Sequence, residues 1–164
     1  GGIPPRRAGG AVAERSSLPV SRLYPERPIL AASIAVFRDG KVLLGARTMA
    51  PHPNVFSLPG GVVELGETLE EAALRELDEE TGVAARIVSF AGHTQVLDRD
   101  ESGRVRRHFV VASFAAHWIS GDGVPSEEAP ELIWADPKNL GDLPVTPGLA
   151  RLLAAACLVV GKAG

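Results

Sequence analysis

Apolar and polar positions divide the first part of the chain into strands and a loop. Residues 29–37 are almost all apolar or small, and residues 42–44 are apolar again. An Asp-Gly pair at 39–40 separates them and is typical of the tight turn of a β-hairpin. Prolines and an asparagine mark residues 47–57 as a loop. Two valines and a glutamate at 62–64 then predict a short strand.

The next segment carries the signals of a single helix. Thr68 followed by Glu71 forms a capping box, and Gly82 stands where a glycine commonly ends a helix. These limits predict a helix close to 69–80. An apolar stripe on it predicts packing against a sheet, while Glu71 and Asp78 point to water. The stripe consists of Ala73, Leu74 and Leu77.

Beyond this helix, β-branched and apolar residues return at the spacing of strands. Residues 84–96 and 106–116 are separated by a charged turn at 98–103, which predicts a second, longer hairpin. Residues 131–134 predict a short strand. A Thr-Pro pair at 146–147 has the form of an N-cap followed by a proline at the first helical position.

The final helix is predicted to run from this pair to about residue 159. Cys157 stands among leucines and alanines there, so we expect it to fill space in the core. The element order is strands, helix, strands and helix, with hairpins in place of regular βαβ units. This order predicts an α+β sandwich, in which helices cover a mixed sheet.

Length and composition fit one globular domain, which we place at 26–161. The chain has 164 residues, of which 45% are hydrophobic. Residues 1–25 are rich in Gly, Pro, Ala and Arg without periodicity, which predicts a flexible N-terminal arm tied down near 23–25. No apolar run approaches the roughly 20 residues that cross a bilayer, and a signal-peptide pattern is missing. We therefore expect a cytoplasmic protein without a membrane partner.

The charge of the chain argues against nucleic acid as a partner. The formal net charge is −3, which gives no basic footprint of the kind that duplex binding requires. Net charge would not attract a phosphate-bearing small molecule either. If the substrate carries phosphates, a metal ion or a few placed arginines must neutralise them locally.

Three glutamates of the first predicted helix share one face. At 100° per residue, Glu76, Glu79 and Glu80 fall within about 100° of one another. Like charges at this spacing repel unless a cation offsets them. Mg²⁺ binds through one or two carboxylates plus phosphate oxygens of the substrate, which makes this face a candidate metal site. Arg75 lies one turn before Glu79 and is placed to pair with it. Taken alone, an acidic helix face is more often a solvated surface.

The segment from Gly61 to Val83 resembles the Nudix box, G-x5-E-x7-R-E-U-x-E-E-x-G-U with U aliphatic. The chain matches every specified position of the box, at Gly61, Glu67, Arg75, Glu76, Leu77, Glu79, Glu80, Gly82 and Val83. A chance match of this length is negligible, so the box outweighs the solvated-surface interpretation. The resemblance implies the α/β/α sandwich of Nudix hydrolases and a pyrophosphohydrolase that uses Mg²⁺, with Mn²⁺ as a substitute.

The resemblance also implies roles for residues of the box. Glu76 and Glu80 would be the principal metal ligands. Glu79 would be a further ligand or the residue that activates water. The carbonyl oxygen of Gly60 would contact the metal as well, and Arg75 would hold the glutamates in place.

The implied reaction is attack of water on one phosphorus of a P–O–P linkage, with a glutamate taking the proton. Glu79 is the first candidate for this base. Glu127 and Glu128, in the loop at 121–130, are alternative bases if that loop folds over the pocket, and an exposed acidic loop is the other interpretation. Glu67 would support the catalytic site from the turn before the helix.

Residues outside the glutamate cluster are expected to select the substrate. Arg47, at the end of the second predicted strand, is a candidate phosphate contact, with an exposed arginine as the alternative. Phe56 and His52 are candidates for a nucleobase pocket, although a loop histidine is more often solvated. Glu64 matches a glutamate common in the family and joins the substrate-binding candidates. Trp134 is expected to pack in the core, with base stacking as the alternative.

The sequence leaves the substrate open. The first hypothesis is a nucleotide sugar such as ADP-ribose, and the second is removal of pyrophosphate from modified (d)NTPs. After Val83 there is no proline until Pro125, so the proline that ADP-ribose pyrophosphatases often carry beyond the box is missing, which weakens the first hypothesis. A non-catalytic ligand sensor of Nudix fold is the third, against which the intact box argues. Many related proteins dimerise, so a homodimer that exchanges the segment near Tyr24 stays open.

Overall fold

The computed structural model describes residues 22–48 and 53–163. The elements are, in chain order, β1 (Ile29–Arg38), β2 (Lys41–Ala46), β3 (Phe56–Ser57), β4 (Gly60–Val62), α1 (Leu69–Thr81), β5 (Ala84–Arg99), β6 (Val105–Ser120), β7 (Leu132–Ala135) and α2 (Leu149–Ala163). Within these described ranges, seven strands form one sheet in the order β3-β2-β1-β6-β5, with β4 paired to β1 and β7 paired to β2. β1 runs parallel to β6 and antiparallel to β2, so the sheet is mixed.

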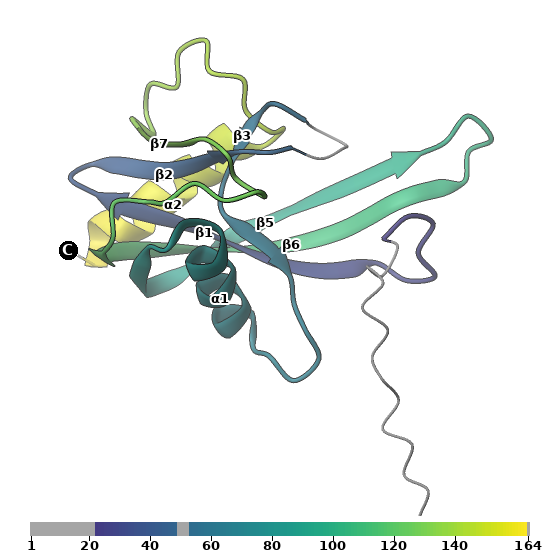
Figure 1. Cartoon of the computed structure of the whole chain (residues 1–164), viewed down its shortest axis with the longest axis horizontal. Coiled ribbons are helices and arrows are strands. Elements are labelled where there is room, and N and C mark those ends of the chain that lie inside the picture. Colours follow the sequence, from purple (N-terminus) through teal and green to yellow (C-terminus); the bar gives the residue numbers. More distant parts are fainter. Residues whose placement is uncertain (1–21, 49–52, 164) are drawn as a thin grey trace, which may run out of the picture.

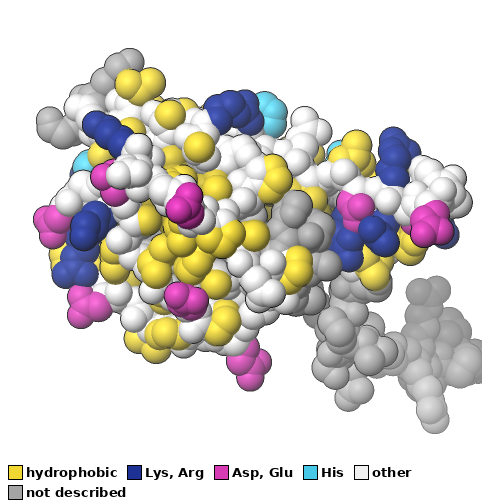
Figure 2. Space-filling view, turned by 90° about the horizontal axis from the view of Figure 1, so that it is seen from above, with side chains coloured by type: hydrophobic (Ala, Val, Ile, Leu, Met, Phe, Trp, Pro, Cys, Tyr) yellow, Lys and Arg dark blue, Asp and Glu magenta, His cyan; other side chains and the backbone are white. Residues whose placement is uncertain are grey.

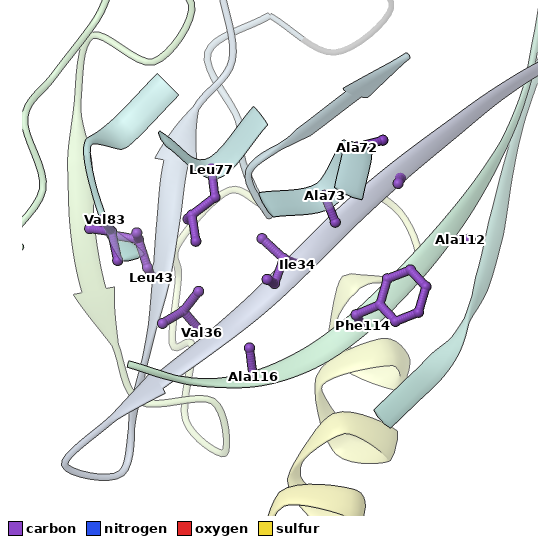
Figure 3. Close-up of a cluster of buried hydrophobic side chains, with 11 residues drawn as sticks. Ile34, Val36, Leu43, Ala72, Ala73, Leu77, Val83, Ala112, Phe114 and Ala116 are labelled. Atoms are coloured by element: carbon purple, nitrogen blue, oxygen red, sulfur yellow. The ribbon is translucent and has the colours of Figure 1, made fainter. Parts of the chain in front are cut away.

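The two helices cover opposite faces of this sheet (Figure 1). Alternate residues of β1 belong to different core clusters, because successive side chains of a strand point to opposite faces. Ile34 packs in the cluster that contains Leu77 of α1, whereas Ala35 packs in the cluster that contains Leu153 of α2. Figure 3 shows Ile34 and Val36 on the side of the sheet that faces Leu77. The predicted α+β sandwich with a mixed sheet between helices is therefore confirmed.

The first hairpin forms as its pattern predicts. β1 and β2 pair next to the turn through Phe37 with Val42 and Arg38 with Lys41. The turn residues at 39–40 both have positive φ, which the favoured two-residue hairpin turn requires. Both faces of β1 are covered, which explains why its sequence is a nearly continuous apolar run without alternation.

The helix α1 begins and ends where the local signals place it. The Thr68 hydroxyl oxygen accepts a hydrogen bond from the Glu71 N–H at 3.1 Å. Gly82 has a φ of 68°, and its N–H donates to the Asp78 carbonyl at 2.9 Å. The side chain of Leu74 is only half-buried. The fully buried residues of this helix are Ala72, Ala73, Leu77 and Thr81.

Two elements start two or three residues away from their predicted positions. The third strand was expected at 62–64, whereas β4 spans Gly60–Val62 and pairs Gly60 with Ser33 of β1. The last helix was expected to open at 146–147, whereas α2 begins at Leu149 and continues to Ala163. Gly148 has a φ of 82°, in the left-handed region, so the helical conformation starts only after it. The N–H of Thr146 donates instead to the carbonyl of Phe56 at 3.0 Å, which ties this segment to β3.

The second hairpin is longer than predicted and extends away from the rest of the sheet (Figure 1). β5 and β6 contain 16 residues each. β6 begins at Val105, but its pairing with β1 begins only at Phe109, so the outer end of the hairpin projects past β1. The carboxylate of Asp100 orders the turn by accepting bonds from the N–H groups of Ser102 and Arg104 at 2.9 and 3.0 Å.

Two single residues lie where the sequence places them. Cys157 is half-buried and packs against the cluster under α2. Trp134 is half-buried against the cluster under α1, and its indole N–H donates to the carbonyl of Asp122 at 3.1 Å. His52 and residues 1–21 lie outside the described residues. Neither helix in the described part of the chain has the length and apolarity that crossing a bilayer requires.

Candidate metal and catalytic site

The site begins with two glycines that bring β4 against β1 and α1. A Cβ atom at Gly60 would lie 2.4 Å from the carbonyl oxygen of Ala32, and one at Gly61 would lie 2.5 Å from Cδ of Glu76. The clash at Gly60 is with backbone, so this position requires glycine, whereas a side chain at position 61 would displace the carboxylate of Glu76. The N–H of Gly60 also donates to Oε2 of Glu80 at 3.3 Å. The glycines therefore place a strand backbone directly on the carboxylate face of α1.

Three carboxylates converge beside this strand. Glu76 and Glu80 come from successive turns of α1, and Glu128 comes from the loop between β6 and β7. One carboxylate oxygen of each lies within 4.8 Å of the others. Oxygens that share one cation at about 2.0–2.6 Å lie at most roughly 4–5 Å apart, and an all-oxygen set suits a hard cation. These side chains therefore fit Mg²⁺ or Mn²⁺.

The backbone of the loop holds Glu128 at this point. The N–H of Val124 donates to the carbonyl of Thr81 at the end of α1, at 2.7 Å. Ser126 and Ala129 bond to each other twice, from the Ser126 N–H to the Ala129 carbonyl at 3.0 Å and from the Ala129 N–H to the Ser126 hydroxyl at 3.2 Å. The Ala129 side chain is buried. Glu128 thus stands between anchored residues, although it lies 48 positions beyond Glu80 in the chain.

Arg75 holds the acidic groups around the cluster in fixed positions. Its Nε and Nη2 atoms donate to the two oxygens of Glu67 at 2.7 and 2.8 Å. Its Nη1 donates to Glu76 at 2.8 Å and to Glu79 at 3.2 Å. Nη2 also donates to the carbonyl of Val62 at 3.1 Å. One guanidinium therefore orients a carboxylate of the cluster, while the Glu79 carboxylate lies on Arg75, outside the group of three.

The surroundings shift the acidity of these glutamates in opposite directions. Burial, followed by the charge of Glu76, raises the pKa of Glu80 to about 8. Burial also raises the pKa of Glu76, against the lowering effect of Arg75. Hydrogen bonds from Arg75 and from the backbone of Glu64 lower the pKa of Glu67 to about 2. A divalent cation would stabilise the ionised forms of Glu76 and Glu80, which supports the fit of a metal here.

The raised pKa of Glu80 predicts a pH-dependent stability of the metal-free protein. Between about pH 4.5 and about 8, the folded state keeps a proton on Glu80 that the unfolded state has released. The free energy of unfolding therefore falls as the pH rises through this interval. Relative to Glu80→Gln, which removes this titration, the wild-type thermal midpoint is expected to fall up to about pH 8 and then to stay level. Melting curves in EDTA measure this difference, and curves that stay parallel over the whole interval would contradict it.

The cluster lies in a pocket of about 200 Å³ that also contains arginines. The described residues that line it are Arg22, Gly45, Ala46, Arg47, Thr48, Ser57, Leu58, Pro59, Gly60, Gly61, Glu76, Glu80, Glu128 and Ala129. Arg47 is exposed, and its charge acts to lower the pKa of Glu80. The structure therefore brings a phosphate-binding candidate to the carboxylates.

Other candidates from the sequence lie elsewhere. Phe56 is buried in the cluster under α2 and is not among the described residues that line the pocket. Glu64 is exposed, and its backbone N–H donates to Glu67 at 2.9 Å. Glu127 is exposed and outside the group of three carboxylates. Arg22 lines the pocket but was not found from the sequence, because it belongs to no motif and lies in the segment predicted as a flexible arm.

Comparisons with known proteins give the family of this chain. The model of the NUDIX domain matches residues 27–156. The ADP-ribose pyrophosphatase of Methanocaldococcus jannaschii is 35% identical over 84% of this chain and 79% of its own length. The NAD-capped RNA hydrolase NudC of Chromobacterium violaceum is 34% identical over 82% of this chain, which spans 48% of the NudC length. The crystal structure of MutT NUDIX hydrolase from Burkholderia pseudomallei matches with a TM-score of 0.69 and 30% identity, over 79% of this chain and 98% of that one.

The mixed sheet between two helices, the acidic helix and the glycine-rich approach to it define a hydrolase of phosphoanhydride bonds. The chain belongs to the Nudix family, and within it the chain is a pyrophosphohydrolase.

Proposed function

We propose that this chain cleaves the phosphoanhydride bond of a nucleotide sugar, with ADP-ribose as the leading substrate. The observation that supports this most is the presence of Glu76, Glu80 and Glu128 in one pocket with Arg47. Carboxylates hold a divalent cation and an arginine binds phosphate, and hydrolysis of a diphosphate uses both. The relative from Methanocaldococcus jannaschii is named as an ADP-ribose pyrophosphatase, which supports this choice of substrate.

In this proposal, Glu76 and Glu80 hold the metal, with the carbonyl oxygen of Gly60 as a further ligand. Mg²⁺, or Mn²⁺ in its place, would lower the pKa of water and offset the negative charge of the phosphate oxygens. Arg75 keeps the Glu76 carboxylate oriented towards the pocket. Glu67, which binds Arg75 through both of its oxygens, keeps the guanidinium in place.

We assign the general base to Glu128. It takes a proton from the attacking water, the water oxygen bonds to one phosphorus, and the bond from that phosphorus to the bridging oxygen breaks. ADP-ribose would yield AMP and ribose 5-phosphate. Glu79, the first candidate from the sequence, is engaged with Arg75 outside the cluster, and Glu127 also lies outside it. Glu128 instead belongs to the cluster but comes from a separate loop, outside α1.

The test is product identification with a substrate panel in Mg²⁺ or Mn²⁺. The panel contains ADP-ribose, other nucleotide sugars, dinucleoside polyphosphates and modified (d)NTPs. AMP plus ribose 5-phosphate as the dominant products from ADP-ribose support the proposal. Dominant turnover of (d)NTPs with release of diphosphate would replace it with the second hypothesis. Bound metal without turnover of any compound would favour the ligand sensor.

Two further parts of the proposal concern the organisation of the chain. We propose residues 26–161 as the Nudix domain and residues 1–25 as an N-terminal arm, and the family match over 27–156 supports the domain limits. The homodimer stays a prediction, which sedimentation equilibrium of the purified protein tests.

A further inference from the structure

Arg22 enters the pocket from a part of the chain that is remote from the Nudix box. It precedes β1 and is exposed, yet it lies among the residues that line the same pocket as the acidic cluster. Arg47 reaches this pocket from the end of β2. Within the described residues, neither guanidinium takes part in a salt bridge with an acidic side chain. Both are therefore available to an anionic ligand.

The charges of the pocket require cations besides the metal. A diphosphate linkage brings two anionic phosphates to three carboxylates, and one divalent cation offsets only part of this charge. Arg75 is already bonded to Glu67 through two donors. Among the described lining residues, the basic side chains are those of Arg22 and Arg47. A guanidinium donates two parallel hydrogen bonds to a phosphate, so two arginines match the two phosphates.

The segment that carries Arg22 is held in place two residues further on. The N–H of Tyr24 donates to the carbonyl of Arg106 at 2.7 Å, and its hydroxyl donates to Asp100 at 2.9 Å. The guanidinium of Arg104 lies 4.4 Å from the centre of the Tyr24 ring. These contacts fasten the segment to the outer end of the β5–β6 hairpin, where Figure 2 shows basic and acidic side chains next to each other. The hairpin end thus anchors the backbone two residues after Arg22.

We propose that Arg22 is a substrate-binding residue that contacts the diphosphate together with Arg47, and that the contact of Tyr24 with Asp100 positions it. This rests on the proposed function, because it assigns a ligand to the same pocket. The role is one of binding, so Arg22 should act on KM more than on kcat. The β5–β6 hairpin then takes part in substrate binding, although its tip lies outside the pocket.

The test is calorimetric binding of methylenediphosphonate with Mg²⁺ to the full chain. This probe has the two phosphorus groups of the anhydride with a bridge that water does not cleave, so binding is measured without turnover. Arg22→Gln is expected to weaken binding about tenfold. Arg22→Lys should recover part of the lost affinity, because lysine keeps the positive charge but cannot donate two parallel hydrogen bonds. Arg27→Gln is the matched control, since Arg27 is exposed on the same segment and is not a lining residue.

The positioning role has its own variant. Tyr24→Phe keeps the ring and removes the hydroxyl that binds Asp100. It is expected to raise the dissociation constant about threefold. With the substrate that the panel identifies, KM should rise in Arg22→Gln and Tyr24→Phe while kcat stays within about twofold of wild type.

The outcomes distinguish the role of Arg22 from its positioning by Tyr24 and from the proposed function. If the wild type binds methylenediphosphonate and Arg22→Gln binds it equally well, the role of Arg22 is overturned while the proposed function stands. If Tyr24→Phe alone behaves like wild type, the positioning by the hairpin is overturned. If the wild type itself does not bind the probe with Mg²⁺, the diphosphate contact of Arg22 and Arg47 is overturned, while the substrate panel decides the proposed function independently.

Discussion

Replacing Glu80 with glutamine is expected to lower kcat roughly 10³-fold and to abolish tight Mn²⁺ binding. Glu80 is half-buried in the cluster of three carboxylates, and burial followed by the charge of Glu76 raises its pKa, so a cation would stabilise its ionised form. A metal that stabilises the transition state supplies several kcal/mol, and each 1.4 kcal/mol corresponds to about tenfold in rate. Glutamine keeps the shape of the side chain, so the loss reports on charge.

The control for Glu80→Gln lies on the same helix. Glu70 is exposed in the first turn of α1 and is not a member of the cluster, so Glu70→Gln should retain wild-type kinetics. Mn²⁺ titration and steady-state kinetics are measured on both variants. If Glu80→Gln retains more than about a tenth of wild-type kcat, Glu80 is not a principal metal ligand.

Replacing Arg75 with lysine is expected to reduce metal affinity and kcat by about 10–100-fold while the positive charge remains. The guanidinium bonds simultaneously to Glu67, Glu76 and Glu79, and a single ammonium group cannot reproduce this fork. Arg75 also acts to lower the pKa of Glu76. Lysine at position 75 should bind Glu76 more weakly than arginine does, so the pKa of Glu76 should rise. The acidic limb of the pH–rate profile should then move to higher pH.

The pH profile distinguishes positioning of Glu76 from a general loss of stability. Arg86→Lys, on the exposed side of β5, is the matched control and should leave both rate and profile unchanged. Thermal melting of both variants reports any change of fold. A loss of rate in Arg75→Lys with an unshifted profile would show that Arg75 does not act through Glu76.

Local signals determined the acidic helix correctly because every group involved lies within a few residues. The Thr68 cap, the Gly82 end and the pairing of Arg75 with Glu79 depend on backbone geometry within one or two turns. The Asp-Gly turn of the first hairpin is local in the same way. The box residues therefore identified the family before any contact between distant segments was known.

Local signals were insufficient where a boundary depends on neighbouring elements. The helix wheel placed Glu79 with Glu76 and Glu80, but the approach of β4 selects the two glutamates on its own side. Phe56 in a polar loop suggested a nucleobase pocket, whereas the pairing of β3 with β2 places it in the core. For both Glu79 and Phe56, the position of the side chain depends on how distant segments pack together.

The sequence by itself determined the chemistry of this protein: an acidic helix that follows a glycine turn, in the pattern of a phosphoanhydride hydrolase. Only the tertiary structure brought Glu128 to the helix glutamates and Arg22 to the same pocket. The physical reason is distance along the chain. Caps and turns are fixed by neighbouring residues, whereas residues separated by about fifty positions meet only after a sheet has ordered the loops between them.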